Sequence, residues 1–371
     1  MFSSAQRPIC FVASARDYHA IDWYRSVKKL NPGRRVFIAT DSIQSEGAFR
    51  LVDEKDEIFC LFDCDKFLFD RQSKFADVWR NLIKICAIIF VAYRLHSLSR
   101  KNNIIFHAHS LYYIGVCWIA RVKFIATPMG SDVLVRPDNS LLYRIFAIFS
   151  LRAAETITVD SIALQKKVRI LCGRSSDLIQ NGIDTEVALT VSKLSGSRDD
   201  VVSFRGMYPN YRLHELLDAR NTSQSFPCFI FLYPFSEEGY LAEARRSFVE
   251  CDKDYGRVGK NTLFHIFSRA FAVFSIPISD SSPRSVYEAI FCGSAVIVTY
   301  GEWIEILPKC MRERLIIVDL TEENWFDDAI RLARKISSIE FNPSKEAVLM
   351  FDEVESMKNV CAKYYTDTPN E

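Results

Sequence analysis

The sequence predicts an α/β protein of two domains, each built on a mostly parallel β-sheet. The chain has 371 residues, more than a single hydrophobic core usually organises. Short β-rich runs alternate with helical runs, the order that produces a parallel sheet covered by helices on both faces. A polar stretch without periodicity, residues 190–200, separates an earlier alternating series from a later one and is the expected linker.

The first series predicts a domain over residues 1–189. Apolar runs bounded by turn residues predict strands, and runs of helical period predict helices. The expected strands are Pro8–Ala13, Val36–Ala39, Ile104–Phe106, Phe124–Ala126, Thr156–Val159 and Asp177–Ile179. The expected helices are Ala20–Leu30, Phe75–Lys101, Leu111–Ala120, Leu141–Arg152 and Ile162–Ile170.

The second series predicts a domain over residues 201–343, by the same reasoning. Its expected strands are Val201–Phe204, Cys228–Tyr233, Val273–Ile276 and Ala295–Val298. Its expected helices are Leu213–Arg220, Glu237–Cys251, Leu263–Ala270 and Arg284–Cys292. Ligands of open parallel sheets bind beyond the carboxyl ends of the strands, so polar residues there are candidates for a site.

Composition excludes some classes of function. Charged residues make up 25% of the chain, the net charge is +1 and there is no dense Lys/Arg block, so a nucleic-acid partner is not expected. The eleven cysteines are scattered, mostly in apolar runs and without a CxxC pair, which predicts reduced thiols and a cytoplasmic protein. The N-terminal residues do not read as a secretory signal.

The segment Ser279–Gly293 is the strongest candidate for chemistry. Pro283 predicts the start of a helix, because the first N–H groups of a helix have no partner within it and proline loses nothing by lacking one. The backbone N–H groups of Arg284 and Ser285 would then point out of the helix and suit an anionic diphosphate. Glu288 lies one turn into the helix, where its carboxylate could accept hydrogen bonds from ribose hydroxyls. The alternative interpretation is an ordinary capped helix with a surface glutamate.

This segment resembles a known signature. Asp280, Glu288 eight residues later and then Gly293 resemble the carboxylate-x7-Glu motif of the family 4 retaining glycosyltransferases, although the family usually has Glu in the first position. The resemblance implies a GT-B fold, in which two Rossmann-like domains face each other across a cleft. It also implies that Glu288 binds the ribose and Asp280 the transferred sugar. The phosphates of the donor would be held by the backbone of Pro283, Arg284 and Ser285.

Two further segments resemble the family's donor site. Arg205, directly after a predicted strand, matches the arginine that binds the diphosphate, and Tyr211 stands where the family has a lysine. His109 resembles the histidine of the donor-sugar pocket. Met129-Gly-Ser-Asp132 resembles the next element, with Met129 in place of its histidine and Asp132 as a catalytic polar group. From the residues alone, His107 and His109 could instead be a metal pair or core histidines, of which core histidines are the better interpretation.

His19 and Trp23 follow the first strand and resemble a variant of the family's acceptor loop. Both side chains can bind a sugar, His19 through hydrogen bonds and Trp23 by stacking, so they are the expected acceptor-binding residues. Ordinary helix packing explains Trp23 equally well. The resemblance also implies that residues 344–371 contain a last helix that packs back on the first domain.

The resemblance implies a cytoplasmic hexosyltransferase that uses a UDP- or GDP-sugar, with no metal and no other cofactor. The acceptor would be a saccharide or a lipid-linked saccharide, in the biosynthesis of a surface polysaccharide such as a capsule or lipopolysaccharide. Two alternatives stay open. A sugar-nucleotide epimerase would bind the same donor. A non-catalytic binding protein would account for Tyr211 and Met129 in place of the family's lysine and histidine.

Two apolar stretches with Lys/Arg flanks, Asn81–Lys101 and Leu141–Arg152, admit two interpretations. Core helices of the first domain are favoured over contact with a membrane. If the acceptor is lipid-linked, peripheral attachment to the inner face of the plasma membrane would explain their apolar surplus.

Overall fold

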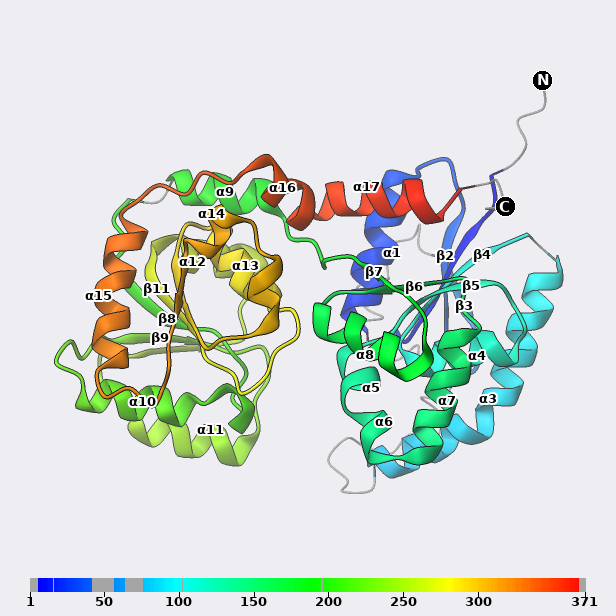
Figure 1. Ribbon diagram of the computed structural model, residues 1–371, viewed down its shortest axis with the longest axis horizontal. Coiled ribbons are helices and arrows are strands. Elements are labelled where there is room, and N and C mark those ends of the chain that lie inside the picture. Colours follow the sequence, from blue (N-terminus) through cyan, green and yellow to red (C-terminus); the bar gives the residue numbers. More distant parts are fainter. Residues whose placement is uncertain are drawn as a thin grey trace. The chain divides into compact units, whose positions relative to one another are not determined.

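The computed structural model describes residues 6–15, 17–41, 57–63, 76–101, 103–194 and 196–366 (Figure 1). The chain forms two compact units. Unit 1 combines the chain up to Asn181 with the chain from Ser356 onward, and unit 2 is Gly182–Glu355. The chain therefore passes from one unit to the other twice. The predicted α/β class, with two parallel sheets, is confirmed.

Unit 1 contains a seven-stranded sheet in the order β3-β2-β1-β4-β5-β6-β7, with every neighbouring pair parallel. Its strands are β1 (Ile9–Val12), β2 (Val36–Thr40), β3 (Ile58–Cys60), β4 (Ile105–His109), β5 (Phe124–Thr127), β6 (Thr156–Val159) and β7 (Asp177–Leu178). The six predicted strands are present. The prediction missed β3, which has three residues and is partly exposed, so it has no apolar pattern to detect.

Helices cover both faces of this sheet (Figure 1). They are α1 (Tyr18–Leu30), α3 (Ala76–Lys101), α4 (Leu111–Ile119), α5 (Gly130–Leu134), α6 (Arg136–Asn139), α7 (Leu141–Arg152), α8 (Ile162–Cys172) and α17 (Glu353–Tyr364). One core lies between the sheet and α3, α4, α7 and α8, and another between the sheet and α1 and α17. The predicted start of α3 at Phe75 lies outside the described residues.

Unit 2 contains a six-stranded parallel sheet in the order β10-β9-β8-β11-β12-β13. Its strands are β8 (Asp200–Ser203), β9 (Phe229–Leu232), β10 (Lys253–Gly256), β11 (Ala270–Ser275), β12 (Ala295–Val298) and β13 (Leu315–Ile317). Its helices are α9 (Thr185–Leu194), α10 (Leu213–Thr222), α11 (Glu238–Ala244), α12 (Lys260–Arg269), α13 (Arg284–Phe291), α14 (Lys309–Arg312), α15 (Trp325–Ser337) and α16 (Lys345–Phe351).

The boundary between the units differs from the predicted linker at residues 190–200. Residues up to Leu194 belong to helix α9, which packs against α12 and α13 inside unit 2. Its Ala188 is fully buried in the unit 2 core. The polar surface of α9 resembled a linker because only a narrow stripe of the helix is buried.

The C-terminal segment forms two helices rather than one. They meet at Asp352, whose carboxylate accepts hydrogen bonds from the N–H groups of Val354 and Glu355 and so caps α17. Helix α16 packs in unit 2, whereas Met357 and Val360 of α17 join the core around α1 in unit 1. The predicted packing on the first domain is therefore a property of α17 alone.

Two cysteines correct the expectation that the thiols are all reduced. Cys228 and Cys251 form a disulfide with a Cα–Cα distance of 5.5 Å. Cys228 precedes β9 and Cys251 precedes β10, and these strands are parallel neighbours, so their starts lie side by side. The prediction missed this pair because it placed Cys251 in a helix over Glu237–Cys251, whereas α11 ends at Ala244.

Removing this disulfide, with Cys228→Ser and Cys251→Ser together, is expected to lower the free energy of unfolding of unit 2 by about 3 kcal/mol, because a cross-link between distant residues restricts the unfolded chain. Urea unfolding with and without reductant measures the effect. Cys86→Ser, at an exposed free cysteine, is the control and should change little. Alkylation of both Cys228 and Cys251 in denatured, unreduced protein would contradict the disulfide.

The interpretation of α3 as a core helix is wrong for most of its surface. Within the described residues, Leu82–Lys101 is long and apolar enough to cross a membrane by length and composition, with a mean hydropathy of 1.6. Only 22% of its most apolar window is buried. The core helix of a soluble protein can meet the same length and hydropathy criteria, but such a helix is mostly buried. Helix α3 is mostly exposed.

Candidate functional site

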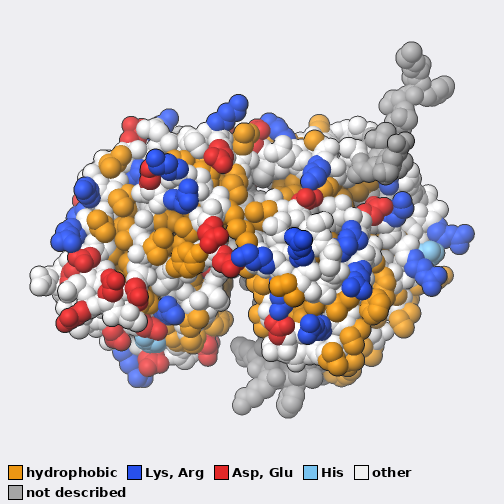
Figure 2. Space-filling view, in the orientation of Figure 1, with side chains coloured by type: hydrophobic (Ala, Val, Ile, Leu, Met, Phe, Trp, Pro, Cys, Tyr) orange, Lys and Arg blue, Asp and Glu red, His pale blue; other side chains and the backbone are white. Residues whose placement is uncertain are grey.

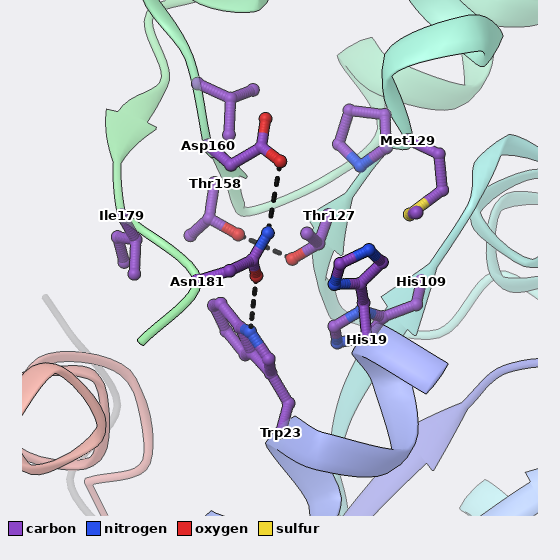
Figure 3. A pocket seen from close by; sticks show the side chains of 11 residues that line it. His19, Trp23, His109, Thr127, Met129, Thr158, Asp160, Ile179 and Asn181 are labelled. Atoms are coloured by element: carbon purple, nitrogen blue, oxygen red, sulfur yellow. Dashed lines mark hydrogen bonds between the residues drawn. The ribbon is translucent and has the colours of Figure 1, made fainter. Parts of the chain in front are cut away.

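A small pocket in unit 1 lies at the carboxyl ends of β4, β5 and β6, beside the start of α1 (Figure 3). It has a volume of ≈ 20 Å³, which is room for one water-sized group. Its lining residues are His19, Trp23, His109, Thr127, Pro128, Met129, Thr158, Val159, Asp160, Ile179 and Asn181. Three residues predicted from separate motifs, His19, Trp23 and His109, are thus brought together.

His109 is the most unusual group of this pocket. It is the last residue of β4, and its side chain is 1% exposed. Neither Nδ1 nor Nε2 has a hydrogen-bond partner in the part of the chain that the structure describes. Burial, together with the neighbouring His19, lowers the pKa of His109 to about 3, so the ring is neutral at physiological pH. A neutral imidazole has one donor and one acceptor, and the described residues satisfy neither of them.

A chain of hydrogen bonds crosses the pocket. The Trp23 indole N–H donates to Asn181 Oδ1 at 3.2 Å, and Asn181 Nδ2 donates to Asp160 Oδ2 at 3.1 Å (Figure 3). Trp23 is 5% exposed, and its ring meets the rings of His107 and His109 edge-on. Trp23 is therefore packed in the core on one side and holds a polar pocket group on the other.

His107 lies behind His109, with ring centroids 4.6 Å apart. Its Nδ1 lies 2.5 Å from the Tyr365 hydroxyl and its Nε2 lies 2.7 Å from Thr127 Oγ1. Both nitrogens thus have a hydrogen-bond partner, and a metal could bind His107 only by displacing the hydroxyl of Tyr365 or Thr127. This is a hydrogen-bonded core histidine, which agrees with the favoured interpretation.

Met129 lines the pocket, but Asp132 does not. Asp132 is 5% exposed, and its Oδ2 accepts the Leu111 N–H at 2.8 Å, at the first turn of α4. Its Oδ1 accepts the Tyr143 hydroxyl at 3.2 Å and lies 3.3 Å from Arg136. These contacts hold α4 and α7 in place, and both carboxylate oxygens are engaged. The structure thus gives Asp132 a structural role, and the expected catalytic role stays a prediction.

Unit 2 has a second candidate region, again at the carboxyl ends of strands. Arg205 follows β8, and its guanidinium forms an ion pair with Asp280, on the loop after β11. The two side chains are 13% and 16% exposed, so the pair is mostly shielded from water. The Arg205 guanidinium also lies over the Tyr211 ring, 4.7 Å from its centroid. Tyr211 thus supports Arg205 by a cation–π contact instead of supplying a second charge.

Asp280 and Pro283 line an open hollow of ≈ 280 Å³. The other lining residues are Ser275, Pro277, Ile278, Ser279, Thr299, Tyr300, Gly301, Glu302 and Trp303. They come from the carboxyl ends of β11 and β12 and from the residues that follow. The hollow is larger than the unit 1 pocket and is bounded on one side by the predicted phosphate-binding loop.

The start of α13 differs in one detail from the prediction. Pro283 is the N-cap, but the Arg284 N–H donates to the Ser282 carbonyl at 3.0 Å and does not point outward. The Ser285 N–H has no hydrogen-bond partner among the described residues. The structure therefore leaves a single N–H group, that of Ser285, for an anion at this helix end.

Glu288 is 7% exposed and does not line the hollow. Its Oε1 lies 3.7 Å from Arg284 Nε, and the Arg284 guanidinium also lies 3.9 Å from Glu353. Lys260 lies 3.7 Å from the same Glu353 carboxylate. The predicted donor residues thus form two groups, Arg205 with Asp280 and Tyr211, and Arg284 with Glu288. Pro283 stands between them in the chain.

The prediction did not include Asp160, Asn181, Thr127 or Thr158 among the site residues. Each lies at or just after the carboxyl end of β5, β6 or β7. Their position after predicted strands could have identified them from the sequence, because polar residues that follow parallel strands meet at one edge of the sheet.

No protein-family model and no curated protein matches the chain. Solved structures resemble it over nearly its whole length. HepE from Anabaena in complex with UDP is 15% identical, with 96% of this chain and 98% of HepE covered and a TM-score of 0.73. Sucrose-phosphate synthase from Thermosynechococcus elongatus is 13% identical, with 97% and 98% covered and a TM-score of 0.70. A glycosyltransferase from Rickettsia africae is 12% identical, with 99% and 100% covered and a TM-score of 0.69. The chain therefore has the GT-B fold, with two Rossmann-like domains.

Proposed function

We propose that the protein is a glycosyltransferase that moves a hexosyl group from a nucleoside-diphosphate sugar to a saccharide or lipid-linked saccharide. The observation that supports this most is His109, a buried neutral imidazole that lines the unit 1 pocket and whose two nitrogens have no hydrogen-bond partner among the described residues. Structures that share the fold include HepE bound to UDP-glucose, which is 16% identical with a TM-score of 0.70. At this identity the likeness supports the proposal through the fold alone.

In this proposal unit 2 binds the donor. Arg205 and the Ser285 N–H at the start of α13 balance the charge of the diphosphate, and Glu288 accepts hydrogen bonds from the ribose. Asp280 binds a hydroxyl of the transferred sugar. It is paired with Arg205 in the structure, so donor binding exchanges this ion pair for contacts with the sugar and with a phosphate.

In unit 1, we propose that His109 donates a hydrogen bond to a sugar and that His19 and Trp23 contact the acceptor. A neutral His109 can donate one hydrogen bond to the sugar without adding charge to a pocket that also contains Asp160. In the reaction the bond between the sugar carbon and the diphosphate breaks, and its electron pair leaves with the diphosphate. The acceptor oxygen bonds to that carbon, and its proton passes to the released diphosphate. We further propose retention of configuration, membership of family 4, and no metal or cofactor.

The proposed setting is the cytoplasm, in the biosynthesis of a surface polysaccharide. Eight cysteines of the described residues are free, which favours a reducing compartment. The Cys228–Cys251 disulfide is the exception, and its chemical state in the purified protein tests this part of the proposal.

Incubation with UDP- and GDP-hexoses and a panel of saccharide acceptors tests the function. We expect nucleoside diphosphate and a glycosylated acceptor, both identified by mass spectrometry. Arg205→Ala should weaken donor binding by ~10- to 150-fold, because a hydrogen bond to a charged group contributes about 1.5–3 kcal/mol. Arg331→Ala, at a guanidinium that is 77% exposed and paired with Asp328, is the control.

Two results would overturn the proposal. An isomerised nucleotide sugar formed without any acceptor would show an epimerase. Donor binding without turnover over the whole panel would show a binding protein that has lost catalysis.

A further inference from the structure

Helix α3 presents a continuous apolar stripe to solvent. Leu82, Ile85, Ile89, Phe90 and Tyr93 are 50%, 69%, 72%, 51% and 69% exposed. They are spaced by three or four residues, apart from the adjacent pair Ile89 and Phe90, so they lie on one face of the helix. The opposite face is anchored in the unit 1 core, as the buried residues show: Ala87, Val91, Ala92 and Leu95.

Helix α7 adds a second row of the same kind. Its Leu141, Leu142, Ile145 and Phe149 are 72%, 80%, 43% and 51% exposed. Helix α4 contacts both α3 and α7, so the three helices lie side by side on one face of the unit. Figure 2 shows apolar side chains gathered over this part of unit 1.

The helices between and around these rows are rigidly packed. Trp118 of α4 stacks on Phe149 of α7, with ring centroids 5.9 Å apart. Gly115 of α4 lies so close to Phe146 that a Cβ at this position would be 2.0 Å from the ring. The exposed rows are therefore held on a fixed surface, which we call the α3–α7 face.

The charges on and around the α3–α7 face are mostly positive. Helix α3 contains one acid, Asp77 near its start, and five Lys or Arg residues: Arg80, Lys84, Arg94, Arg100 and Lys101. Residues 102–131 add Arg121 and Lys123 and no Asp or Glu. Helix α7 adds Arg144 and Arg152 and no acid.

Acidic groups from neighbouring elements neutralise a few of these cations. Asp41 lies 3.8 Å from Lys84, Asp132 lies 3.3 Å from Arg136 on α6, and Glu155 lies 3.4 Å from Lys123. Arg100, Lys101 and Arg144 remain exposed on the two helices. The balance of the face is therefore apolar and cationic.

We propose that the α3–α7 face binds peripherally to a bilayer that contains anionic lipids. The exposed apolar side chains would enter the boundary between headgroups and acyl chains, and the cations would face the lipid phosphates. Helix α3 lies along the surface in this arrangement and does not cross the bilayer, because its other face is buried in the core. The inference does not depend on the proposed reaction.

A second copy of this chain fits the face less well. A two-fold dimer through the same surface would place cations opposite cations, which opposes association. An anionic lipid surface can bury the exposed apolar side chains and also pair its phosphates with the exposed cations.

Co-sedimentation of the full-length protein with vesicles tests the proposal. We expect binding to phosphatidylcholine vesicles that contain phosphatidylglycerol, weaker binding to pure phosphatidylcholine, and release at high salt. The double variant Ile85→Glu and Ile89→Glu should lower the partition coefficient at least ~10-fold, because it removes apolar contacts and adds charge of the same sign as the lipid. Ile339→Glu, at a side chain that is 63% exposed in unit 2, is the control and should bind like wild type.

Circular dichroism and thermal unfolding show whether the variants are folded. The proposal is wrong if wild-type protein does not bind the anionic vesicles, or if the double variant binds them equally well. A third result would also contradict it. If the wild-type protein is a dimer by light scattering, does not bind vesicles, and becomes monomeric in the double variant, the α3–α7 face is occupied by a second copy of the chain.

Discussion

Replacing Glu288 with alanine is expected to weaken the binding of a nucleotide-sugar donor by at least ~100-fold. In the proposed function its carboxylate accepts two hydrogen bonds from the ribose, and each bond to a charged group contributes about 1.5–3 kcal/mol. The side chain is 7% exposed and lies 3.7 Å from Arg284 Nε, so donor binding exchanges this contact for contacts with the ribose. Isothermal titration calorimetry with the donor identified by the sugar-nucleotide panel measures the change.

The protein should remain folded after this change. Arg284 lies 3.9 Å from Glu353 as well as 3.7 Å from Glu288, so it keeps a carboxylate nearby. Glu288→Gln, which preserves the shape, should bind the donor with intermediate affinity. Glu313→Ala, at a side chain that is 63% exposed, is the matched control. If Glu288→Ala binds the donor as tightly as wild type, Glu288 is not part of the donor site.

Replacing His109 with phenylalanine is expected to lower the rate of transfer by ~10²- to 10³-fold without destabilising the protein. Loss of one well-placed hydrogen-bond donor to a transition state typically has an effect of this size. Stability should be unchanged or higher by ~1 kcal/mol, because the variant removes two buried nitrogens that have no partner. Single-turnover kinetics and urea unfolding measure the two effects separately.

His107→Phe is the control, with the opposite expectation for stability. His107 is equally buried, but its nitrogens contact the hydroxyls of Tyr365 and Thr127. Its loss leaves the Tyr365 hydroxyl unsatisfied, at about 1–3 kcal/mol of stability, whereas the Thr127 hydroxyl keeps its hydrogen bond with Thr158. A His109→Phe variant that is destabilised like His107→Phe and that retains its activity would assign His109 to the core instead of the site.

The pH dependence of stability gives a second test of His109→Phe. The pKa of His109 is about 3 in the folded protein, against 6.5 for an ordinary histidine. Below pH ~6.5 the unfolded chain takes up a proton that the folded protein does not, so stability falls by about 1.4 kcal/mol per pH unit as the pH decreases toward 3. His109→Phe should remove this contribution. The lowered pKa of His107 gives a similar slope that the variant keeps. Equal slopes in wild type and variant would contradict a buried neutral His109.

The alternating pattern of the chain allowed most of the fold to be predicted. Strands such as β6 (Thr156–Val159) and helices such as α7 (Leu141–Arg152) were predicted with the bounds that the structure shows. The periodicity of an amphipathic element is a local property, so it can be read from neighbouring residues. The prediction missed β3, β10 and β13, three strands at sheet edges that are partly exposed and therefore lack a continuous buried apolar run. It also missed helix α15 (Trp325–Ser337), although that helix is amphipathic.

The site was predictable to the extent that it depends on strand ends. His109 ends a buried strand and Arg205 and Asp280 each follow one, and the carboxyl ends of parallel strands meet at one edge of a sheet. The sequence by itself thus determined the presence of two α/β units and several of the residues at the carboxyl edges of their sheets.

Only the tertiary structure decided which partner each of these side chains has. Arg205 pairs with Asp280 from 75 residues away, Asp132 is used by α4 and α7, and both nitrogens of His109 remain unsatisfied. It also decided that α3 exposes an apolar face and that Cys228 joins Cys251. These outcomes depend on contacts between segments far apart in the chain, and a local pattern of residues carries no record of such contacts.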